Sequence, residues 1–381
     1  MNVNGHTTGR QGGRSRPASI RDVAAAAGVS YQTVSRVINE HPMVKQSTRE
    51  LVLATIEELG YRPNRAARAL AGGPVESVTV LTSNTTLYGY ASALQGIEEA
   101  ARGAGFTVGV RVVDSDAEEA VTEAVARAVE PGGALIVLAF DRAGTSALAA
   151  VPDGVPMVAA VETPVGDEGE GQPWVWMDDR EAARQATRYL LGLGHETVHY
   201  VVIPSSTDNS QRTAGWRMAL QEAGVPVPDP VQAGWDPRSG YEAGRALAAD
   251  PEVTAVLCGN DDLAIGVIRA MHEAGRAIPD SVSVAGFDDM PQSEFLTPAL
   301  TTVRLDFIEL GRACVALLRP FLDPQRAPEP RPRPQPELIV RESTGPAPRR
   351  GPAPIRDRGT GPATRRGTRP GRPRPAGHGG A

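Results

Sequence analysis

The chain has 381 residues and a formal net charge of −6 at pH 7, with 41% hydrophobic and 22% charged residues. This composition is typical of a globular protein, and the length is enough for two or three cores. The two cysteines exclude a disulfide scaffold and a four-cysteine zinc site. No apolar run reaches the roughly 18 residues that a membrane span needs, and no secretory signal is visible. We therefore expect a cytoplasmic protein with no membrane partner.

The charge is distributed unevenly along the chain. Residues 1–72 carry a net charge of +5 and residues 345–381 a net charge of +8, so the region between them carries −19. A basic first segment joined to an acidic body suggests that only the basic segment contacts a polyanion such as DNA. A basic tag of no consequence is the alternative that charge alone leaves open.

The first segment is predicted to be helical. Residues 1–17 are polar and rich in glycine and arginine, and they are expected to form a disordered arm. Residues 18–62 have helix signals and no strand pattern, and residues 63–75 follow as a hinge helix and linker. The expected helices run from the capping box Ser19-Ile20-Arg21-Asp22 to Gly28, from Tyr31 behind a Ser30 cap to about Asn39, from the capping box Ser47-Thr48-Arg49-Glu50 to Leu59, and from Asn64 to Ala71.

Residues 76–345 alternate between short apolar runs and helical segments. The expected strands are 77–81, 107–113, 134–140, 157–161, 198–203, 255–258, 283–287 and 337–341. The expected helices are 91–103, 116–129, 180–193, 212–223, 240–249, 262–274 and 307–318.

This alternation predicts an α/β fold of parallel sheets flanked by helices, and its length implies two lobes. A ligand of such a fold binds beyond the carboxyl ends of the strands, so a cleft between the lobes is the expected site. The last segment, residues 346–381, has too few apolar residues to order itself and is expected to be a disordered tail.

The first two helices fit a helix-turn-helix motif whose turn is Gly28-Val29-Ser30. On the second helix, Val34, Val37 and Ile38 fall on one face and are expected in the core. The opposite face carries polar side chains that reach base edges and phosphates. A polar face on a small helical bundle is the alternative. The candidate DNA contacts on this helix are Tyr31, Gln32, Thr33, Ser35, Arg36 and Asn39.

Several motifs together resemble one known family. They are Ile20–Ala24, Gly28–Asn39, Gly60–Leu70, Gly192-Leu193-Gly194-His195, Ala214-Gly215-Trp216, Asn260-Asp261, Val284–Asp289 and Leu300-Thr301-Thr302-Val303. Over residues 18–345 the chain resembles the LacI/GalR family of transcription regulators. The resemblance implies a homodimer that binds double-stranded DNA at a palindromic operator, with a periplasmic-binding-protein-like core.

The resemblance also implies a role for the hinge. The hinge segments fold into helices only on DNA, which agrees with the marginal stability of an isolated eight-residue helix. Asn64 in this segment is a further candidate DNA contact, and the family's lever leucine corresponds to Leu70, which would enter the minor groove and kink the duplex. A linker leucine packed on the core is the alternative for Leu70. The Pro-rich tail is unable to form a helix, so tetramers through a C-terminal helix are not expected.

For the core, the resemblance implies an effector between the lobes. Arg212 and Asp288 would bind hydroxyl groups, for which charged partners form the stronger hydrogen bonds. Asn260 would add an amide, and Trp235 would stack on the C–H face of a sugar ring. The first lobe and the helix at 307 would complete the lining with Leu87, Tyr88, Tyr90 and Phe307.

Some alternatives stay open for these residues. Asp288 would cap a following helix, Arg212 would sit in a surface ion pair, or Trp235 would belong to the core. The first-lobe aspartate of the family falls near Val161 with Glu162 adjacent, so the sugar is not identified.

Two enzyme-like patterns are rejected. His195-Glu196-Thr197-Val198-His199 matches a zinc-protease motif, but that chemistry needs both histidines on one helix, and the segment reads as a turn and a strand. Histidines four apart on a strand lie roughly 13 Å apart, whereas zinc needs ligands at about 2 Å. The acidic pairs Asp178-Asp179, Asp261-Asp262 and Asp288-Asp289 follow strands and are expected to cap helices. We expect no catalytic residue, no metal and no cofactor.

The sequence therefore predicts a DNA-binding transcriptional repressor whose operator binding is controlled by a small ligand, with a sugar as the first choice. A purine-type corepressor is the alternative within this class. A sugar-binding protein without a role on DNA and a sugar-acting enzyme are the alternatives outside it.

Overall fold

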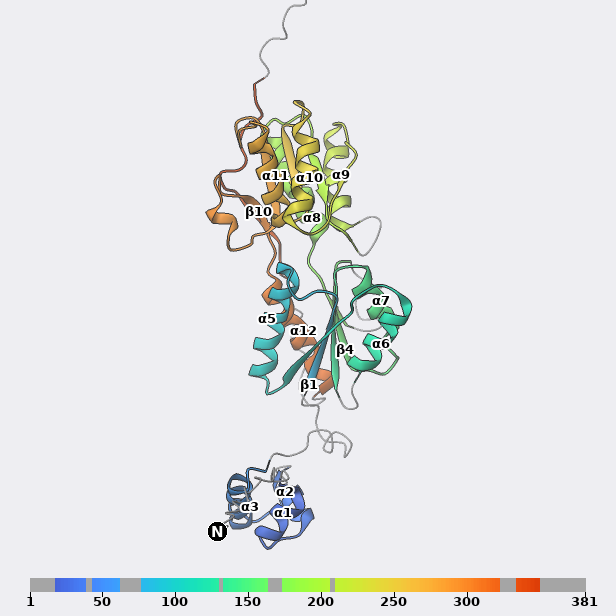
Figure 1. Cartoon of the computed structure of the whole chain (residues 1–381), viewed down its shortest axis with the longest axis vertical. Helices are drawn as coiled ribbons and strands as arrows, with labels where there is room; N and C mark the ends of the chain where they lie inside the picture. The colour runs from blue at the N-terminus through green and yellow to red at the C-terminus, as the bar shows by residue number, and fades with distance from the viewer. Residues whose placement is uncertain are drawn as a thin grey trace, which may run out of the picture. The chain divides into compact units, whose positions relative to one another are not determined.

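A computed structural model describes residues 18–38, 43–61, 77–129, 133–163, 173–205, 210–322 and 334–349 (Figure 1). The predicted arm, the predicted hinge and nearly all of the predicted tail lie outside the described residues. The same holds for three of the predicted DNA contacts, Asn39, Asn64 and Leu70. Within the described part, no helix is long and apolar enough to cross a membrane.

The head consists of α1 (Ile20–Ala26), α2 (Tyr31–Ile38) and α3 (Gln46–Glu58). The capping box at α1 is confirmed, because the Ser19 hydroxyl accepts a hydrogen bond from the Asp22 amide while the Asp22 carboxylate accepts one from the Ser19 amide. Ser30 caps α2 by accepting from the Thr33 amide at 3.1 Å. The helices enclose a very small core in which Val23, Val34, Val37 and Val52 are at most 2% exposed.

The capping box predicted for α3 is wrong. The helix begins at Gln46, so Ser47 already lies in its first turn, and Lys45 stands at the cap position without a side-chain hydrogen bond. Glu50 accepts instead from the Gln46 side-chain amide at 2.9 Å, one helical turn away. The pair thus braces the helix surface and leaves the first backbone amides without a side-chain cap.

The first lobe is built on a parallel sheet of strand order β2-β1-β3-β4-β5. Helices α5 and α12 cover one face of this sheet, and α6 and α7 cover the other. Its elements are β1 (Ser77–Thr82), α5 (Tyr88–Gly103), β2 (Thr107–Val112), α6 (Glu118–Ala128), β3 (Ala134–Ala139), α7 (Arg142–Ala150), β4 (Met157–Val161), β5 (Trp174–Val175) and α12 (Phe307–Leu322).

The second lobe is built on a sheet of strand order β11-β10-β9-β8-β6-β7, in which only β11 runs antiparallel to its neighbour. Helices α8 and α9 cover one face, and α10 and α11 cover the other. Its elements are α8 (Asp179–Gly192), β6 (His199–Val202), α9 (Gln211–Ala223), β7 (Val231–Gln232), α10 (Pro237–Ala248), β8 (Ala255–Cys258), α11 (Asp261–Glu273), β9 (Ser283–Asp288), the 3-10 helix η1 (Ser293–Phe295), β10 (Thr301–Arg304) and β11 (Glu337–Ile339).

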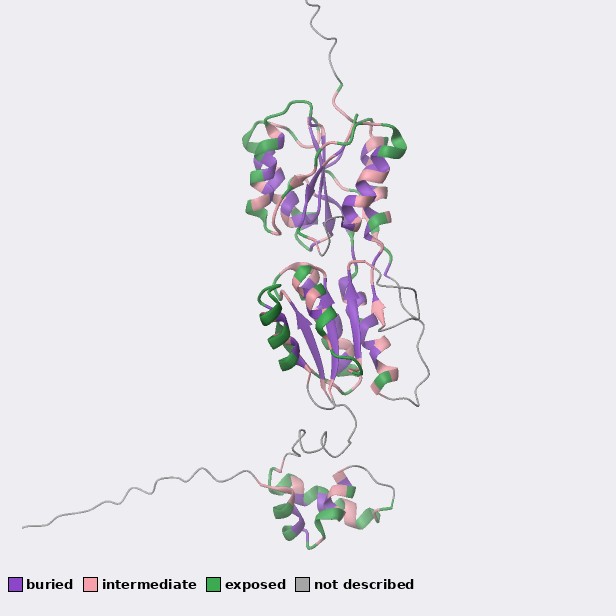
Figure 2. Cartoon of the chain, turned by 90° about the vertical axis from the view of Figure 1, so that its right-hand side faces the viewer, coloured by how far each residue is buried: buried purple, intermediate pink, exposed green. Residues whose placement is uncertain are grey.

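The α/β class with two lobes is confirmed, and Figure 2 shows the buried strands at the centre of each lobe. The sequence pattern missed α7 and placed the starts of α5 and α10 three residues late. Asp236 caps α10 by accepting from the amides of Arg238 and Ser239, and Pro237 is the first helical residue. Strands β5, β7 and β10, of two to four residues each, were also missed.

Candidate functional site

The exposed face of α2 is the first candidate site. Tyr31, Gln32 and Arg36 are exposed, Thr33 and Ser35 are half-buried, and the remaining side chains of α2 face the head core. The Thr33 hydroxyl already shares a hydrogen bond with Ser30 at 2.8 Å, so it belongs to the helix cap as much as to the surface. The arrangement leaves one amide, one phenol and one guanidinium free to reach base edges or phosphates.

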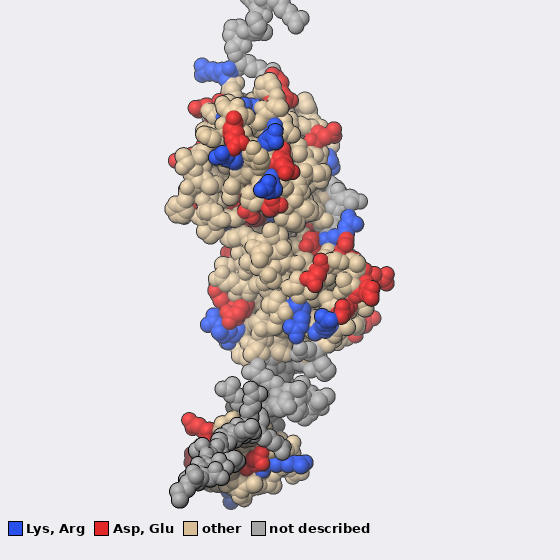
Figure 3. All heavy atoms as spheres, viewed as in Figure 1, with Lys and Arg blue, Asp and Glu red and all other residues tan. Residues whose placement is uncertain are grey.

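The surface of the two lobes differs from that of a DNA-binding stripe. On the face shown in Figure 3, acidic and basic side chains are interspersed over the described residues of both lobes. Ion pairs between helices use several of them, such as Arg312 with Glu99 at 2.8 Å. Mixed charge of this kind gives no continuous attraction for a phosphate backbone on this face.

The second candidate site is a cavity lined from both lobes at the carboxyl ends of their strands. All eight predicted effector contacts line it: Leu87, Tyr88, Tyr90, Arg212, Trp235, Asn260, Asp288 and Phe307. The sequence did not assign the other lining residues to the effector: Gly89, Phe140, Val161, Glu162, Met177, Asp179, Ile203, Pro204, Asp262 and Leu310.

The first lobe supplies an aromatic wall. Phe307, at the start of α12, meets Tyr88 and Phe140 edge to face at centroid distances of 6.2 Å each. Phe140 in turn meets Tyr90 at 5.1 Å. Such edge-to-face contacts hold the rings in a fixed orientation, so the wall offers a rigid apolar surface to a ligand. Phe140 stands one residue beyond β3, and only the closeness of β3 to α5 and α12 brings it into the wall.

The second lobe supplies the charged groups. Arg212, in the first turn of α9, is only 7% exposed and donates from Nε to Oδ2 of Asp179 at 2.8 Å. Its Nη1 donates to the carbonyl of Gly259 and lies 3.8 Å from Oδ1 of Asp288. The guanidinium also lies over the ring of Phe287, 4.6 Å from its centroid. Arg212 is therefore a buried hub and not a member of a surface ion pair.

Burial and neighbouring charges shift the pKa values of both Asp288 and Arg212. Burial raises the pKa of Asp288 well above its usual range; Arg212 opposes this rise, while Asp261 and Asp179 add to it. Burial by itself would lower the pKa of Arg212, but Asp179 and Asp288 raise it above its ordinary value. One guanidinium thus faces two carboxylates. A neutral Asp288 donates a hydrogen bond to a ligand hydroxyl, and an ionised one accepts.

Asn260 organises the cavity wall through both ends of its amide. Its Oδ1 accepts from the Leu263 amide at 2.8 Å and so caps α11, while its Nδ2 donates to the backbone carbonyl of Trp235 at 3.0 Å. Trp235 is half-buried at the edge of the cavity. Asn260 therefore acts first on the position of the indole.

The prediction for the three acidic pairs is only partly correct. Asp178 caps α8 as expected, accepting from the Glu181 amide at 2.9 Å, but its neighbour Asp179 turns inward to Arg212. Asn260, and not Asp261, caps α11. Asp288 and Asp289 cap no helix; both have positive φ, 106° and 51°. Sequence position after a strand indicates a cap, but it does not tell which carboxylate the tertiary contacts redirect.

The zinc-protease pattern is divided between a turn and a strand. His195 precedes β6 and its ring nitrogens bond the hydroxyls of Thr254 and Ser283 at 3.0 Å each, while His199 opens β6. Among the described residues, no group of three His, Cys, Asp or Glu side chains is arranged to hold a metal ion. The pattern is thus used for packing in the second lobe.

A helix-turn-helix head followed by a two-lobed core with a polar cavity defines a class: DNA-binding regulators that respond to a small ligand. Residues 19–64 match the model for bacterial regulatory proteins of the lacI family, and residues 187–344 match that for the periplasmic binding protein-like domain. The chain belongs to the lacI family, which confirms the resemblance drawn from its motifs.

The relatives agree along most of the chain. It is 32% identical over 307 residues to the lactose operon repressor of Escherichia coli (strain K12), covering 79% of this chain and 83% of the relative. It is 30% identical over 333 residues to the transcriptional repressor PurR of Pasteurella multocida (strain Pm70), covering 86% and 98%. A structure of the Lac repressor dimer bound to operator and the anti-inducer ONPF is similar at a TM-score of 0.76 and 30% identity, covering 87% of this chain and all of that one. These relatives are transcriptional regulators and not enzymes.

Proposed function

We propose that this protein is a transcriptional repressor that binds a palindromic operator as a homodimer and is regulated by a small polyhydroxylated ligand, a sugar, in the cavity between its lobes. The operator is contacted by Tyr31, Gln32, Thr33, Ser35 and Arg36 on α2. In this proposal Asn39, Asn64 and Leu70 add contacts from the end of that helix and from the hinge, within the boundaries 18–62 for the head and 63–75 for the hinge. The protein acts in the cytoplasm, where its operator lies.

One observation carries the choice of ligand class: the cavity opposes a rigid aromatic wall to a buried cluster of charged groups. A sugar ring has an apolar C–H face and a rim of hydroxyls, each able to donate and accept. The wall of Tyr88, Phe140 and Phe307 suits the first, and Arg212 with Asp288 suits the second. A purely apolar ligand would make no hydrogen bond to Arg212 or Asp288 and would leave this polar side of the cavity unused.

A ligand in this cavity would regulate operator binding because residues of both lobes line the cavity. A ligand that contacts α5 and α12 from one lobe and β9 and α9 from the other binds more tightly to one relative setting of the lobes than to others. It shifts the population of the repressor only by this differential affinity. The proposed output is the ability of two heads to occupy an operator at the same time.

A corepressor of the purine type is the second candidate, and the aromatic wall is the observation that favours it. Two of the rings, Phe140 and Phe307, offer faces and edges to a planar base as well as to a sugar. The two candidate ligands have opposite effects on operator affinity. An inducing sugar weakens the operator complex, whereas a corepressor tightens it.

The test is a gel-shift titration with the full chain. Wild-type protein is screened by calorimetry against monosaccharides, disaccharides and purine bases, and each binder is then added to the operator complex. Asp288→Asn should abolish the response while leaving operator affinity in the absence of ligand unchanged. The matched control Glu98→Gln removes a carboxylate from the exposed side of α5 and should respond normally. A normal response of Asp288→Asn would remove this residue from the ligand site; failure of the wild type to bind any duplex would refute the function.

A further inference from the structure

Asp261 is a fully buried carboxylate without a cation. It is the first residue of α11, its exposed fraction is 0%, and it does not line the cavity. Among the described residues, its hydrogen bonds come only from uncharged donors: the Met290 amide at 2.9 Å, the Ser293 hydroxyl at 2.6 Å and the Thr302 hydroxyl at 2.6 Å. A buried charge without an ion pair is costly, so its retention calls for a specific role.

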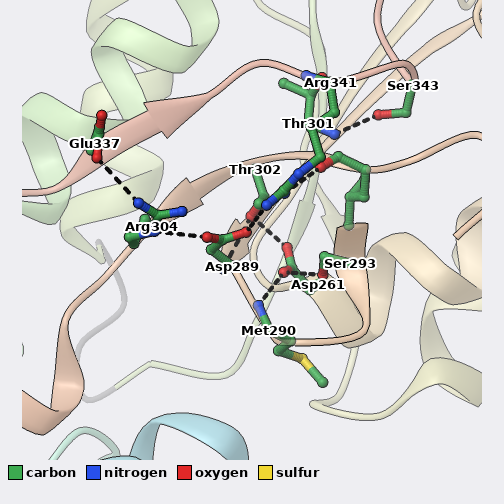
Figure 4. A network of polar contacts seen from close by, with 11 residues as sticks. Asp261, Asp289, Met290, Ser293, Thr301, Thr302, Arg304, Glu337, Arg341 and Ser343 are labelled. Carbon is green, nitrogen blue, oxygen red and sulfur yellow. Dashed lines mark hydrogen bonds and ion pairs between the residues drawn. The ribbon is translucent and has the colours of Figure 1, made fainter. Parts of the chain in front are cut away.

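The donors show which part of the chain this carboxylate holds. Met290 and Ser293 belong to the turn that joins the end of β9 to the start of η1, defined here as residues 288–293, and Thr302 lies on strand β10, which pairs with β9 (Figure 4). The turn starts with Asp288, which faces the cavity, and continues with Asp289. Asp288 therefore faces the cavity, whereas Asp261 contacts the turn without lining the cavity.

The backbone of the turn has a conformation that depends on contacts with other parts of the chain. Asp288 and Asp289 are the non-glycine residues with positive φ in the described chain, at 106° and 51°. Such conformations are strained and persist only where surrounding contacts hold them in place. Asp289 is held by Arg341 at 2.6 Å and Arg304 at 2.7 Å, and Asp261 holds the residues after it.

Strand β9 leaves room for this arrangement. A Cβ atom on Gly286 would lie 2.2 Å from Oδ1 of Asp261, so the absence of a side chain there permits the carboxylate to approach the strand. Asp261 therefore lies beside Gly286 of β9, two residues before Asp288 in the same strand. Gly286 thus leaves space for the Asp261 carboxylate, and the three donors satisfy it with hydrogen bonds.

We propose that Asp261 is a positioning residue for the cavity: its carboxylate holds the turn 288–293 and with it Asp288, so loss of this carboxylate releases the turn and weakens the ligand response. The functional consequence rests on the proposed role of Asp288 in ligand binding. The mechanical part, the hold on the turn, is independent of any ligand.

The charge state of Asp261 changes near neutral pH. Burial raises its pKa to about 6, against the lowering effect of Ser293, Thr302 and the Met290 amide. A neutral carboxyl keeps these contacts: Oδ2 still accepts from the Met290 amide and the Ser293 hydroxyl, while a protonated Oδ1 donates to the Thr302 hydroxyl. Because the pKa is higher in this buried site than in water, protonation favours the closed turn over one that exposes Asp261, and the hold persists as the pH falls through about 6. The titratable groups that face Asp261 are Asp288 and Asp289 on the turn, Cys258 at the end of β8 and Tyr88 on α5.

Hydrogen–deuterium exchange of the full chain tests the hold without a ligand. In the wild type, protection of the peptide covering the turn, corrected for the intrinsic pH effect, should not fall between about pH 7.5 and about pH 5. Asp261→Ala removes the acceptor of all three hydrogen bonds, so protection should be roughly ten- to hundredfold lower at both pH values. Asp261→Asn keeps an acceptor oxygen for the Met290 amide and the Ser293 hydroxyl and should restore most of the protection. The matched control Glu98→Ala removes an exposed carboxylate of α5 and should retain the wild-type profile.

Ser293→Ala keeps Asp261 and removes one donor, so it carries the test if Asp261→Ala does not fold; it should lower protection of the turn at neutral pH. Wild-type protection of the turn in Asp261→Ala, or in Ser293→Ala where the first variant is unfolded, overturns the proposal. Protection in Asp261→Asn as low as in a folded Asp261→Ala equally overturns it, because the acceptor oxygen would then not be what holds the turn. Failure to find an effector would affect the proposed function alone, since exchange of the turn is measured on the protein without ligand.

Discussion

Replacing Arg212 with Met tests the buried charge cluster most directly. Methionine retains much of the apolar stem of arginine and removes the guanidinium. The variant leaves Asp179 and Asp288, whose side chains are only 10% and 11% exposed, without the cation that lies 2.8 Å and 3.8 Å from their oxygens. Removal of one partner of a buried pair lowers the free energy of unfolding by about 3–5 kcal/mol.

This loss should depend on pH in a defined direction. Burial already raises the pKa of Asp288 and Arg212 opposes the rise, so the variant raises this pKa further. A carboxyl whose pKa is higher in the folded than in the unfolded state stabilises the fold at low pH, and this contribution is lost as the pH rises through the folded-state pKa. The deficit of Arg212→Met should therefore be largest near pH 8 and smaller near pH 5.

The assay is thermal unfolding of the full chain by scanning calorimetry at about pH 8 and about pH 5. With about 2–4 °C per kcal/mol for a domain of 150–250 residues, the expected decrease in Tm is roughly 6–20 °C at the higher pH. The control Arg102→Met breaks an ion pair with Glu98 in which the arginine side chain is 70% exposed, and it should change stability by less than about 1 kcal/mol. An equal decrease at both pH values, or one no larger than that of the control, would refute the reasoning.

Two further changes test the head and the helix packing. Arg36→Ala, on the exposed face of α2, should weaken operator binding by about 1–3 kcal/mol in a gel shift and relax the base preference; unchanged affinity would show that another helix reads the operator. Gly96→Ala would place a Cβ atom 2.0 Å from the carbonyl oxygen of Ile308, pushing α5 from α12 and lowering the free energy of unfolding by about 1–3 kcal/mol. The control is Gly103→Ala at the end of α5, where nothing lies within 4 Å and stability should not fall; equal Tm values for the two alanine variants would contradict this account of the packing.

Local patterns were enough for the head and for the class of fold. The Ser19 cap, the turn at Gly28 and the apolar spacing of α2 involve residues within a few positions of one another, so short-range geometry decides them. The alternation of apolar runs and helices likewise predicts parallel sheets, because a buried strand and an amphipathic helix have different periods. Of the eight cavity residues, Asn260 and Asp288 lie in the motifs quoted for the family, and the resemblance to the family supplied the other six.

Only the tertiary structure decided how the acidic residues are used. Asp178, Asp179 and Asp261 all lie at helix starts after strands, and their local sequence predicts a cap for each. The fold uses the first as a cap, pairs the second with Arg212 on α9 and surrounds the third with donors from the turn after β9. These partners are distant in the chain, and sequence spacing carries no signal for contacts that depend on the register of neighbouring strands and the approach of helices. The local sequence thus determined which helices and strands form. The packing of these helices and strands determined which charged side chains come into contact.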